Sequence, residues 1–155
     1  MSLAMGSSMM DNSVITWLRS SLFDEAIKVN KEAGFADLDM DWLKRQFDEP
    51  QTYTMGCFDH RGLLLGWTLH RKRARQYQVI WICVREGSKL QGHGTSMLNR
   101  FKGWLSNDLD RRTIDAYVNE YNVKAQVFLR AKGFKCRPPE AGSSTYQFSF
   151  AKDQL

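Results

Sequence analysis

Apolar positions recur along this chain with two different periods, which separate the predicted strands from the predicted helices. Period two or a β-branched run indicates a strand, and apolar residues three or four positions apart indicate a helix. The predicted strands cover residues 14–19, 51–58, 63–70, 76–84, 112–118 and 145–151. The predicted helices begin at Ser20 or Ser21, at Asp39 or Asp41, after Gly94, and at Asn122.

Two predicted hairpins join the three middle strands. Asp59-His-Arg-Gly62 is a typical turn sequence, and Arg71-Lys-Arg-Ala-Arg75 supplies the second connection. The strand 76–84 is apolar on both of its alternating faces. Since this pattern is typical of a strand covered on both sides, we expect it at the centre of the sheet.

The last two predicted helices carry apolar residues at helical spacing. The earlier one is expected to bury a single face, formed by Met97, Leu98, Phe101, Trp104, Leu105 and Leu109. The later one begins at Asn122, a good capping residue, and ends at Gly133. Its apolar residues are Val123, Val127, Phe128 and Ala131.

The composition indicates one folded domain. The chain has 155 residues, of which 43% are hydrophobic, enough to bury a core. We interpret residues 1–10, rich in Met and Ser, as an expression scar or a disordered start, and residues 11–155 as the domain. No apolar run is long enough to span a membrane, and no signal-peptide pattern appears.

The cysteines and histidines predict no metal site. Cys57, Cys83 and Cys136 are odd in number and form no C-x-x-C pair, which argues against a disulfide framework or a zinc site and favours the cytoplasm. The three histidines show no metal-ligand spacing. Of these, His93 is expected to face solvent.

Charge is distributed unevenly around the net value of +5. Residues 21–50 are net negative, and the rest of the chain is strongly positive. The acidic segment is interpreted as solvated helix faces or as a rim that attracts a cationic amine. The basic run 71–75 is interpreted as a solvated hairpin tip or as a contact for an acidic partner or nucleic acid.

A glycine-rich turn follows the central strand and predicts an anion site. Gly92 and Gly94 precede a helix, whose first N–H groups and positive dipole end attract phosphate. It is not a P-loop, because His93-Gly94 stands where Lys-Ser/Thr is required. It is not a dinucleotide fingerprint either, because Met97 occupies the third glycine position.

Two motifs resemble those of the GNAT family of N-acetyltransferases. The family's Gln/Arg-x-x-Gly-x-Gly/Ala signature corresponds to Lys89-Leu-Gln-Gly92-His-Gly94, after a strand ending at Val84. Lys89 replaces the usual glutamine or arginine and keeps the positive charge of arginine. The family's Asn-x-x-Ala…Gly-Phe helix is matched from Asn122 to Phe134. The resemblance covers residues 13–150. It implies a single α/β domain, with a mixed, mostly antiparallel sheet of about six or seven strands and helices on both faces.

The resemblance also implies acetyl-CoA as the cofactor. In the family, the pyrophosphate lies on the glycine turn, and the pantetheine arm pairs with the end of the central strand. The residues that match this site are Ile82, Cys83, Val84, Lys89, Leu90, Gln91, Gly92, His93, Gly94, Thr95, Ser96, Asn122 and Phe128. Asn122 is alternatively a plain helix cap.

The catalytic positions depart from the family pattern. Leu129 stands where the family usually carries the tyrosine that acts as general acid. The strand 76–84 contains no carboxylate. Asp115 and Tyr117 lie two residues apart on the next strand and therefore share a face. The candidates are Asp115, Glu86 and Glu120 as general bases and Tyr117 and Tyr121 as general acids.

Two functions remain open from the sequence. The first is acetyl-CoA-dependent transfer of an acetyl group to a primary amine of a small molecule, peptide or protein, with the acidic segment favouring a cationic acceptor. The second is a catalytically weak or inactive module of the same fold that contacts nucleic acid or an acidic partner through residues 71–75. Leu129 favours the second. In either case we expect a cytoplasmic monomer or homodimer without a membrane partner.

Overall fold

The structure is a computed structural model that describes residues 14–17, 23–33, 40–85 and 92–155. Its first elements are β1 (Val14–Trp17), α2 (Phe23–Glu32), α3 (Met40–Asp48), β2 (Thr52–Phe58), β3 (Leu64–Lys72) and β4 (Gln76–Val84). They are followed by α4 (His93–Asn107), β5 (Thr113–Asn119), α5 (Val123–Ala131), β6 (Lys135–Arg137), β7 (Thr145–Ala151) and the 3-10 helix η3 (Lys152–Gln154). The predicted order is confirmed, and the short β6 and η3 are additions to it.

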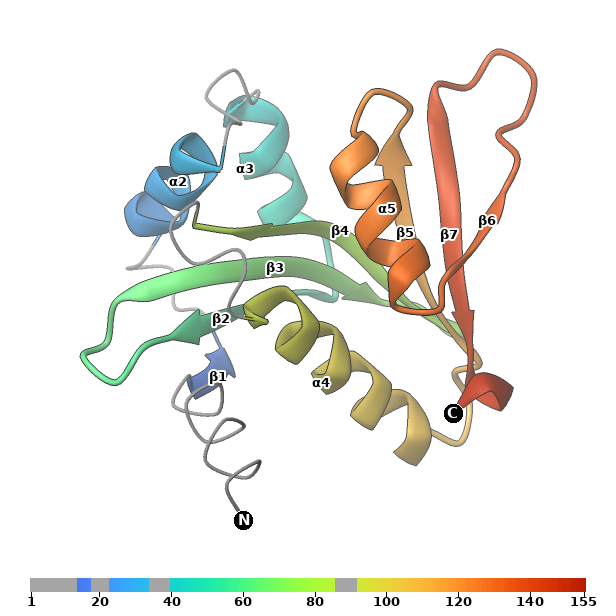
Figure 1. Cartoon of the computed structure of the whole chain (residues 1–155), viewed down its shortest axis with the longest axis horizontal. Helices are drawn as coiled ribbons and strands as arrows, with labels where there is room; N and C mark the ends of the chain where they lie inside the picture. Colours follow the sequence, from blue (N-terminus) through green and yellow to red (C-terminus); the bar gives the residue numbers. More distant parts are fainter. Residues whose placement is uncertain (1–13, 18–22, 34–39, 86–91) are drawn as a thin grey trace. The chain divides into compact units, whose positions relative to one another are not determined.

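The strands form a seven-stranded mixed sheet in the order β1-β2-β3-β4-β5-β7-β6 (Figure 1). β1 pairs antiparallel with β2, and β7 pairs antiparallel with both β5 and β6. β4 and β5 are parallel, and their register runs from Gln76–Thr113 to Val79–Ala116. The predicted α/β fold with a mixed, mostly antiparallel sheet is confirmed, and β4 has the central place expected of it.

The chain divides into two compact units. The first comprises the chain up to Leu69 together with Trp81–Leu98. The second comprises His70–Ile80 and Asn99–Leu155. A sequence-based expectation of one domain from residue 11 to residue 155 stays a prediction. Each unit is described by itself below.

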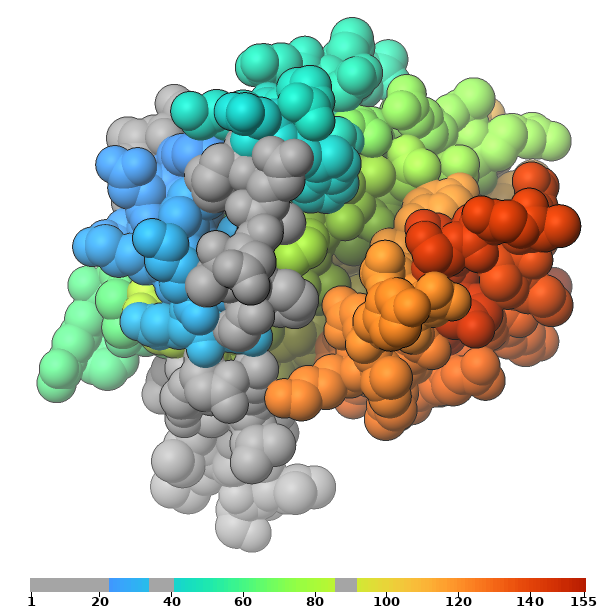
Figure 2. Space-filling view, turned by 90° about the horizontal axis from the view of Figure 1, so that it is seen from above, coloured from blue at the N-terminus to red at the C-terminus, as the bar shows by residue number. Residues whose placement is uncertain are grey.

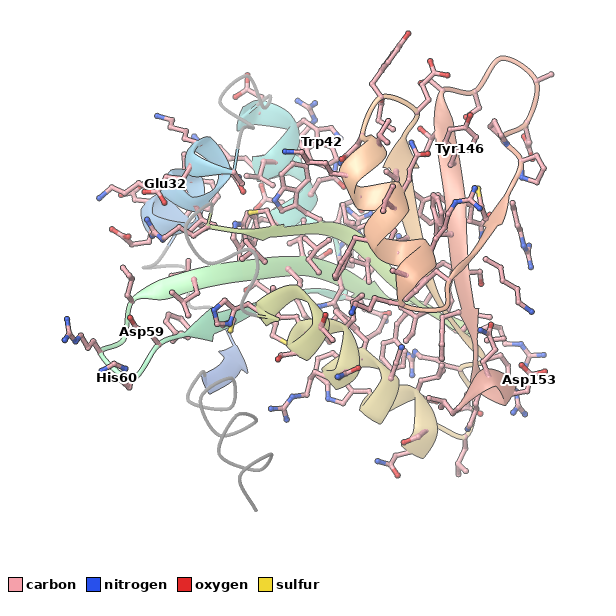
Figure 3. The ribbon with its side chains drawn as sticks, viewed as in Figure 1. Glu32, Trp42, Asp59, His60, Tyr146 and Asp153 are labelled. Carbon is pink, nitrogen blue, oxygen red and sulfur yellow. The ribbon has the colours of Figure 1, made fainter. Side chains whose placement is uncertain are left out.

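The β2–β3 turn in the first unit is built by local hydrogen bonds. Asp59 Oδ1 accepts from the backbone N–H of Arg61 at 2.8 Å and of Leu63 at 2.9 Å. Gly62 has a φ of 86°, which glycine adopts without steric cost. The N–H of Leu63 is the main cause that holds the pKa of Asp59 below its usual value. Figure 3 shows Asp59 and His60 at the tip of this predicted hairpin.

Helices cover both faces of β3 in the first unit, as predicted. On one face, Phe47 of α3 stacks on Trp67 with 5.9 Å between ring centroids, and Trp67 Nε1 donates to Asn30 Oδ1 of α2 at 3.1 Å. Figure 2 shows α2 (blue) and α3 (cyan) side by side. A Cβ added to Gly66 would lie 2.8 Å from the backbone oxygen of Cys83 on β4 and 3.1 Å from Met97 Cε of α4, which covers the other face. This close approach explains why the strand carries glycine there.

In the second unit, α4 and α5 lie on the same face of β7. Lys102 Nζ of α4 lies 4.4 Å from the ring centroid of Phe150, and the Arg130 guanidinium of α5 lies 5.7 Å from that of Phe148. Because side chains alternate along a strand, the residues between these phenylalanines and their partners on β5 lie on the opposite face. That face carries Thr113, Asp115, Tyr117, Gln147 and Ser149.

One expectation about a helix face was wrong, and a second helix buries a residue that the sequence analysis did not place on its apolar face. Leu109 does not belong to the buried stripe of α4, because the helix ends at Asn107 and Leu109 is 86% exposed. Val123 and Val127 of α5 are exposed, while Leu129 is the buried residue of that helix. Helical spacing identifies residues that share a stripe, but packing selects which stripe is buried.

Candidate functional site

The first unit contains the predicted anion site at the beginning of α4. Gly92 has a φ of 80°, and its carbonyl accepts from Ser96 N at 2.9 Å and from Ser96 Oγ at 3.0 Å. Since Ser96 closes the first turn, the backbone N–H groups of His93, Gly94 and Thr95 come before the first intrahelical bond. These donors and the positive end of the helix dipole form the kind of site that binds phosphate.

His93 is buried, so the expectation that its side chain faces solvent was wrong. It is 4% exposed, and its Nδ1 lies 3.7 Å from Sγ of Cys57 on β2. Burial lowers the pKa of His93, which favours the neutral ring. The His93 side chain therefore packs the first turn of α4 against β2. The backbone N–H of His93 remains at the N-terminus of the helix.

The end of β4 leads into this turn. The Cys83 side chain is buried, and its Sγ donates to Asn30 Oδ1 at 2.9 Å. Ile82 and Val84 are only partly buried, so β4 is less completely covered than its apolar sequence predicts. The register with β5 runs to Val79, and the backbone of the three residues 82–84 lies beyond it.

Four residues predicted for the site, Glu86, Lys89, Leu90 and Gln91, lie outside the described residues. The residue before them, Arg85, is anchored within the first unit. Its Nη1 donates to Glu32 Oε1 at 2.6 Å, and its Nη2 lies 3.9 Å from Glu25 Oε2. Two acids of the predicted acidic rim are therefore already paired with a cation of the protein.

In the second unit, Asn122 caps α5. Its Oδ1 accepts from the backbone N–H of Ala125 at 3.2 Å, which gives the Asn-x-x-Ala spacing a structural reason. At the other end, Gly133 has a φ of 91°, and Phe134 N donates to Leu129 O at 3.0 Å. Both halves of the second motif therefore help to define the ends of one helix.

Two further residues of α5 were singled out by the resemblance. The Leu129 side chain is buried, so this position points into the core of the second unit. Phe128 is partly buried, with Lys132 Nζ 5.8 Å from its ring centroid. Leu129 has no proton to donate, and its burial explains why an apolar residue is stable there.

β5 presents Asp115 and Tyr117 to one cavity, which confirms that they share a face. The cavity has a volume of about 520 Å³ and is bordered by the four arginines 73, 75, 112 and 137. Asp115 is 5% exposed; its Oδ2 accepts from Thr113 Oγ1 at 3.1 Å, and its Oδ1 is buried without a hydrogen-bond partner. The other candidates, Glu120 and Tyr121, are exposed beyond the end of β5 and do not line the cavity.

Fewer basic residues of the hairpin 71–75 are exposed than the sequence indicates. Arg71 is buried within β3, so the expectation of a uniformly solvated tip over 71–75 was wrong. Arg73, Ala74 and Arg75 are exposed, and Arg73 N donates to Gln76 O at 2.9 Å across the turn. The exposed charge of this tip comes from two arginines.

Sequence reasoning missed two groups of residues. Asn30 accepts hydrogen bonds from buried side chains of the first unit. Its position at helical spacing from Ala26 and Ile27 could have indicated a polar residue on the buried face of α2. Arg112 and Arg137 border the cavity of the second unit. The sequence did not indicate that these two arginines lie near one another, because they belong to separate segments that are brought together only by the pairing of β5 and β6 with β7.

Comparison with known proteins places the fold. By sequence, the chain matches no protein-family model and none of the curated proteins. By structure, it is similar to a GNAT-family acetyltransferase of Staphylococcus aureus, with a TM-score of 0.74, 11% identity, and 90% of this chain and 99% of that chain covered. It is also similar to the PaiA N-acetyltransferase of Thermoplasma acidophilum in complex with coenzyme A, with a TM-score of 0.71, 14% identity and coverage of 90% and 98%.

A third similar structure is the ribosomal-protein-alanine N-acetyltransferase of Escherichia coli, with a TM-score of 0.71, 14% identity and coverage of 90% and 92%. At these identities the likeness shows the fold alone, which is that of the GNAT acetyltransferases. Within the described part of the chain, no helix has the length and apolar character needed to cross a membrane.

Proposed function

We propose that this protein is an N-acetyltransferase that transfers the acetyl group of acetyl-CoA to a primary amine. The observation that carries the proposal is the beginning of α4, where Gly92 with its positive φ directly precedes three N–H groups without intrahelical partners. The coenzyme's pyrophosphate would bind these groups. Its pantetheine arm would pair with the backbone of residues 82–84, which lies beyond the β4–β5 register. The fold shared with known acetyltransferases supports this assignment.

Transfer requires the amine nitrogen to attack the thioester carbonyl, which forms the C–N bond and breaks the C–S bond. The amine proton passes to a base, and the departing thiolate takes up a proton. Asp115 is our proposed base, with Glu86 as an alternative, and Tyr117 is the proposed acid. Because Leu129 has no proton to donate, positioning of the reactants and the low basicity of a thiolate would carry more of the rate.

The acceptor and the compartment are parts of the same proposal. We propose a primary amine of a small molecule, peptide or protein as the acceptor. Glu25 and Glu32 are paired with Arg85, so these two acids would attract a cationic acceptor less strongly than the sequence suggests. A reducing cytoplasm suits the three cysteines, none of which forms a disulfide. The oligomeric state is expected to be a monomer or a homodimer.

The proposal is tested by coenzyme binding to a matched pair of variants on α4. The valine side chain of Gly94→Val would occupy the space in which the coenzyme approaches the backbone at the anion site. Gly103→Val makes the same change at a position where an added Cβ meets no atom within 4 Å. Acetyl-CoA should raise the melting temperature of the wild type and of Gly103→Val but not of Gly94→Val. Thiol release with a panel of amines then measures transfer. Lack of binding by the wild type at millimolar acetyl-CoA would refute the proposal.

A second candidate function is a GNAT-fold module that binds nucleic acid or an acidic partner without catalysis. The buried Leu129 and the exposed Arg73 and Arg75 favour it. Binding of a labelled single-stranded oligonucleotide should then weaken with salt and be lost in the Arg73→Glu/Arg75→Glu variant. The pair Lys124→Glu/Lys135→Glu makes the same change of charge on exposed residues outside the hairpin and should leave binding intact.

A further inference from the structure

The cavity in the second unit that Asp115 and Tyr117 line also carries four arginines, and the proposed acetyl transfer gives these arginines no role. Its four arginines come from three separate segments of the chain. Arg73 and Arg75 belong to the β3–β4 turn, Arg112 immediately precedes β5, and Arg137 ends β6. The backbone N–H of Arg112 donates to Arg75 O at 2.8 Å, which ties the turn to the start of β5.

The arginine side chains are available to a ligand. Within the described part of the chain, none of these four arginines forms an ion pair with a carboxylate. The Arg73 side chain makes one long hydrogen bond, from Nε to Gln78 Oε1 at 3.4 Å. Four guanidinium groups around one cavity repel one another, and an anion between them would relieve that repulsion. Guanidinium groups also match the oxygens of a phosphate with paired hydrogen bonds.

The floor of the cavity supplies a second, independent observation. Asp115 is 95% buried, and its Oδ1 has no hydrogen-bond partner. The other oxygen, Oδ2, accepts from Thr113 Oγ1 at 3.1 Å. A buried acceptor without a partner is unfavourable, so Oδ1 is suited to receive an N–H or O–H from a bound molecule. The ligand should therefore carry a donor close to its anionic group.

We propose that this cavity binds a small phosphate ester that carries an amino or hydroxyl donor next to the phosphate. The arginines would hold the phosphate, and Asp115 Oδ1 would accept from the donor. The volume of about 520 Å³ suits a small molecule. The negative Asp115 at the floor disfavours a nucleic-acid strand, whose phosphates would approach it. The site is formed entirely by residues of the second unit. It shares Asp115 and Tyr117 with the proposed acid–base pair, but none of the residues proposed to bind the coenzyme lines it.

The test is isothermal titration calorimetry of the full chain without coenzyme. The probes are O-phosphoethanolamine, glycerol 3-phosphate, inorganic phosphate and uncharged glycerol. At least one ester should bind about tenfold more tightly than inorganic phosphate, since it adds one hydrogen bond to a charged acceptor. Glycerol should not bind. The better ester identifies the donor as an amine or a hydroxyl.

Variants distinguish this cavity from general attraction by a basic protein. Arg112→Glu/Arg137→Glu should abolish ester binding, while Arg100→Glu, an exposed position on α4 outside the cavity, should not. Asp115→Ala should bind inorganic phosphate more tightly and lose its preference for the ester. Should Asp115→Ala fail to fold, the arginine variants and the series of probes still decide.

Three results would overturn the proposal. They are absence of ester binding by the wild type at millimolar concentration, equal weakening by Arg100→Glu, and binding of a single-stranded oligonucleotide but of neither ester. Acetyl-CoA binding measured on the same samples reports separately on the proposed transferase function. The two proposals can therefore fail independently.

Discussion

Trp81 Nε1 donates a hydrogen bond to Asn30 Oδ1 at 3.0 Å, and thereby links the centre of β4 to α2. The same oxygen accepts from Trp67 Nε1 at 3.1 Å and from Cys83 Sγ at 2.9 Å. One amide carbonyl thus satisfies three donors inside the first unit. Because Trp67 is buried, loss of this acceptor would leave its indole N–H without a replacement from water.

We predict that Asn30→Ala lowers the free energy of unfolding by about 1–3 kcal/mol, because it removes a shared acceptor and leaves the buried N–H of Trp67 without this bond. The measurement is urea unfolding followed by tryptophan fluorescence. Asn107→Ala is the matched control, since Asn107 is exposed and makes one side-chain hydrogen bond to Gly103 O within its own helix. A loss of similar size in both variants would contradict the role assigned to Asn30.

His70 should make the protein less stable in mild acid. The ring is fully buried against Phe101 and Trp104, with centroid distances of 4.8 and 5.3 Å. Burial, with a smaller contribution from Lys72, lowers the pKa of His70 from 6.5 to about 3. Between these values the unfolded chain binds a proton that the folded chain does not. Stability therefore falls as the pH drops below about 6, by up to about 1.4 kcal/mol per pH unit.

The His70→Phe variant isolates this contribution. Urea unfolding of both proteins from pH 4.5 to pH 7.5 should give a difference in unfolding free energy that shrinks or reverses towards acid. Other titrating groups contribute equally to both curves and cancel in the difference. Parallel curves over the whole range would show that His70 does not titrate on unfolding.

Tyr77 should ionise late. Its hydroxyl donates to Asp108 Oδ2 at 2.7 Å, and burial together with this bond raises the pKa of Tyr77 to about 12. In turn, the backbone N–H of Arg111 and the Tyr77 hydroxyl hold the pKa of Asp108 well below its usual value. An absorbance titration of the phenolates should show a component near pH 12 that disappears in Tyr77→Phe. The matched control is Tyr121→Phe, at an exposed tyrosine, which should retain the component near pH 12. Loss of this component in Tyr121→Phe would show that it does not come from Tyr77.

Asn122 allows a structural role to be separated from a ligand contact. Asn122→Ala should cost about 1 kcal/mol, because the Ala125 N–H loses its cap. Asn122→Ser should recover most of that stability, since serine is also a good cap. If Asn122 also touches the coenzyme, the serine variant should bind acetyl-CoA more weakly at nearly normal stability. Chemical unfolding and calorimetry measure the two effects, and normal affinity of the serine variant would limit Asn122 to capping.

The sequence alone determined the elements whose causes are local. The Asp59–Gly62 turn, the Asn122 cap and the glycine at the end of α5 were all predicted, because each depends on hydrogen bonds or dihedral angles within a few residues. The order of strands and helices was predicted for the same reason. The three-residue β6 was missed, because it is too short to show a period.

Only the tertiary structure decided which side chains meet across long distances in sequence. Asn30 receives its donors from residues 37, 51 and 53 positions away, and the cavity beside Asp115 collects arginines from three segments. His93 was expected in solvent and is buried, because β2 packs against the first turn of α4. Local sequence encodes which hydrogen bonds a segment can make by itself. Strand pairing and the packing of helices on the sheet determine which polar groups are brought together, and these contacts define the two sites proposed for this protein.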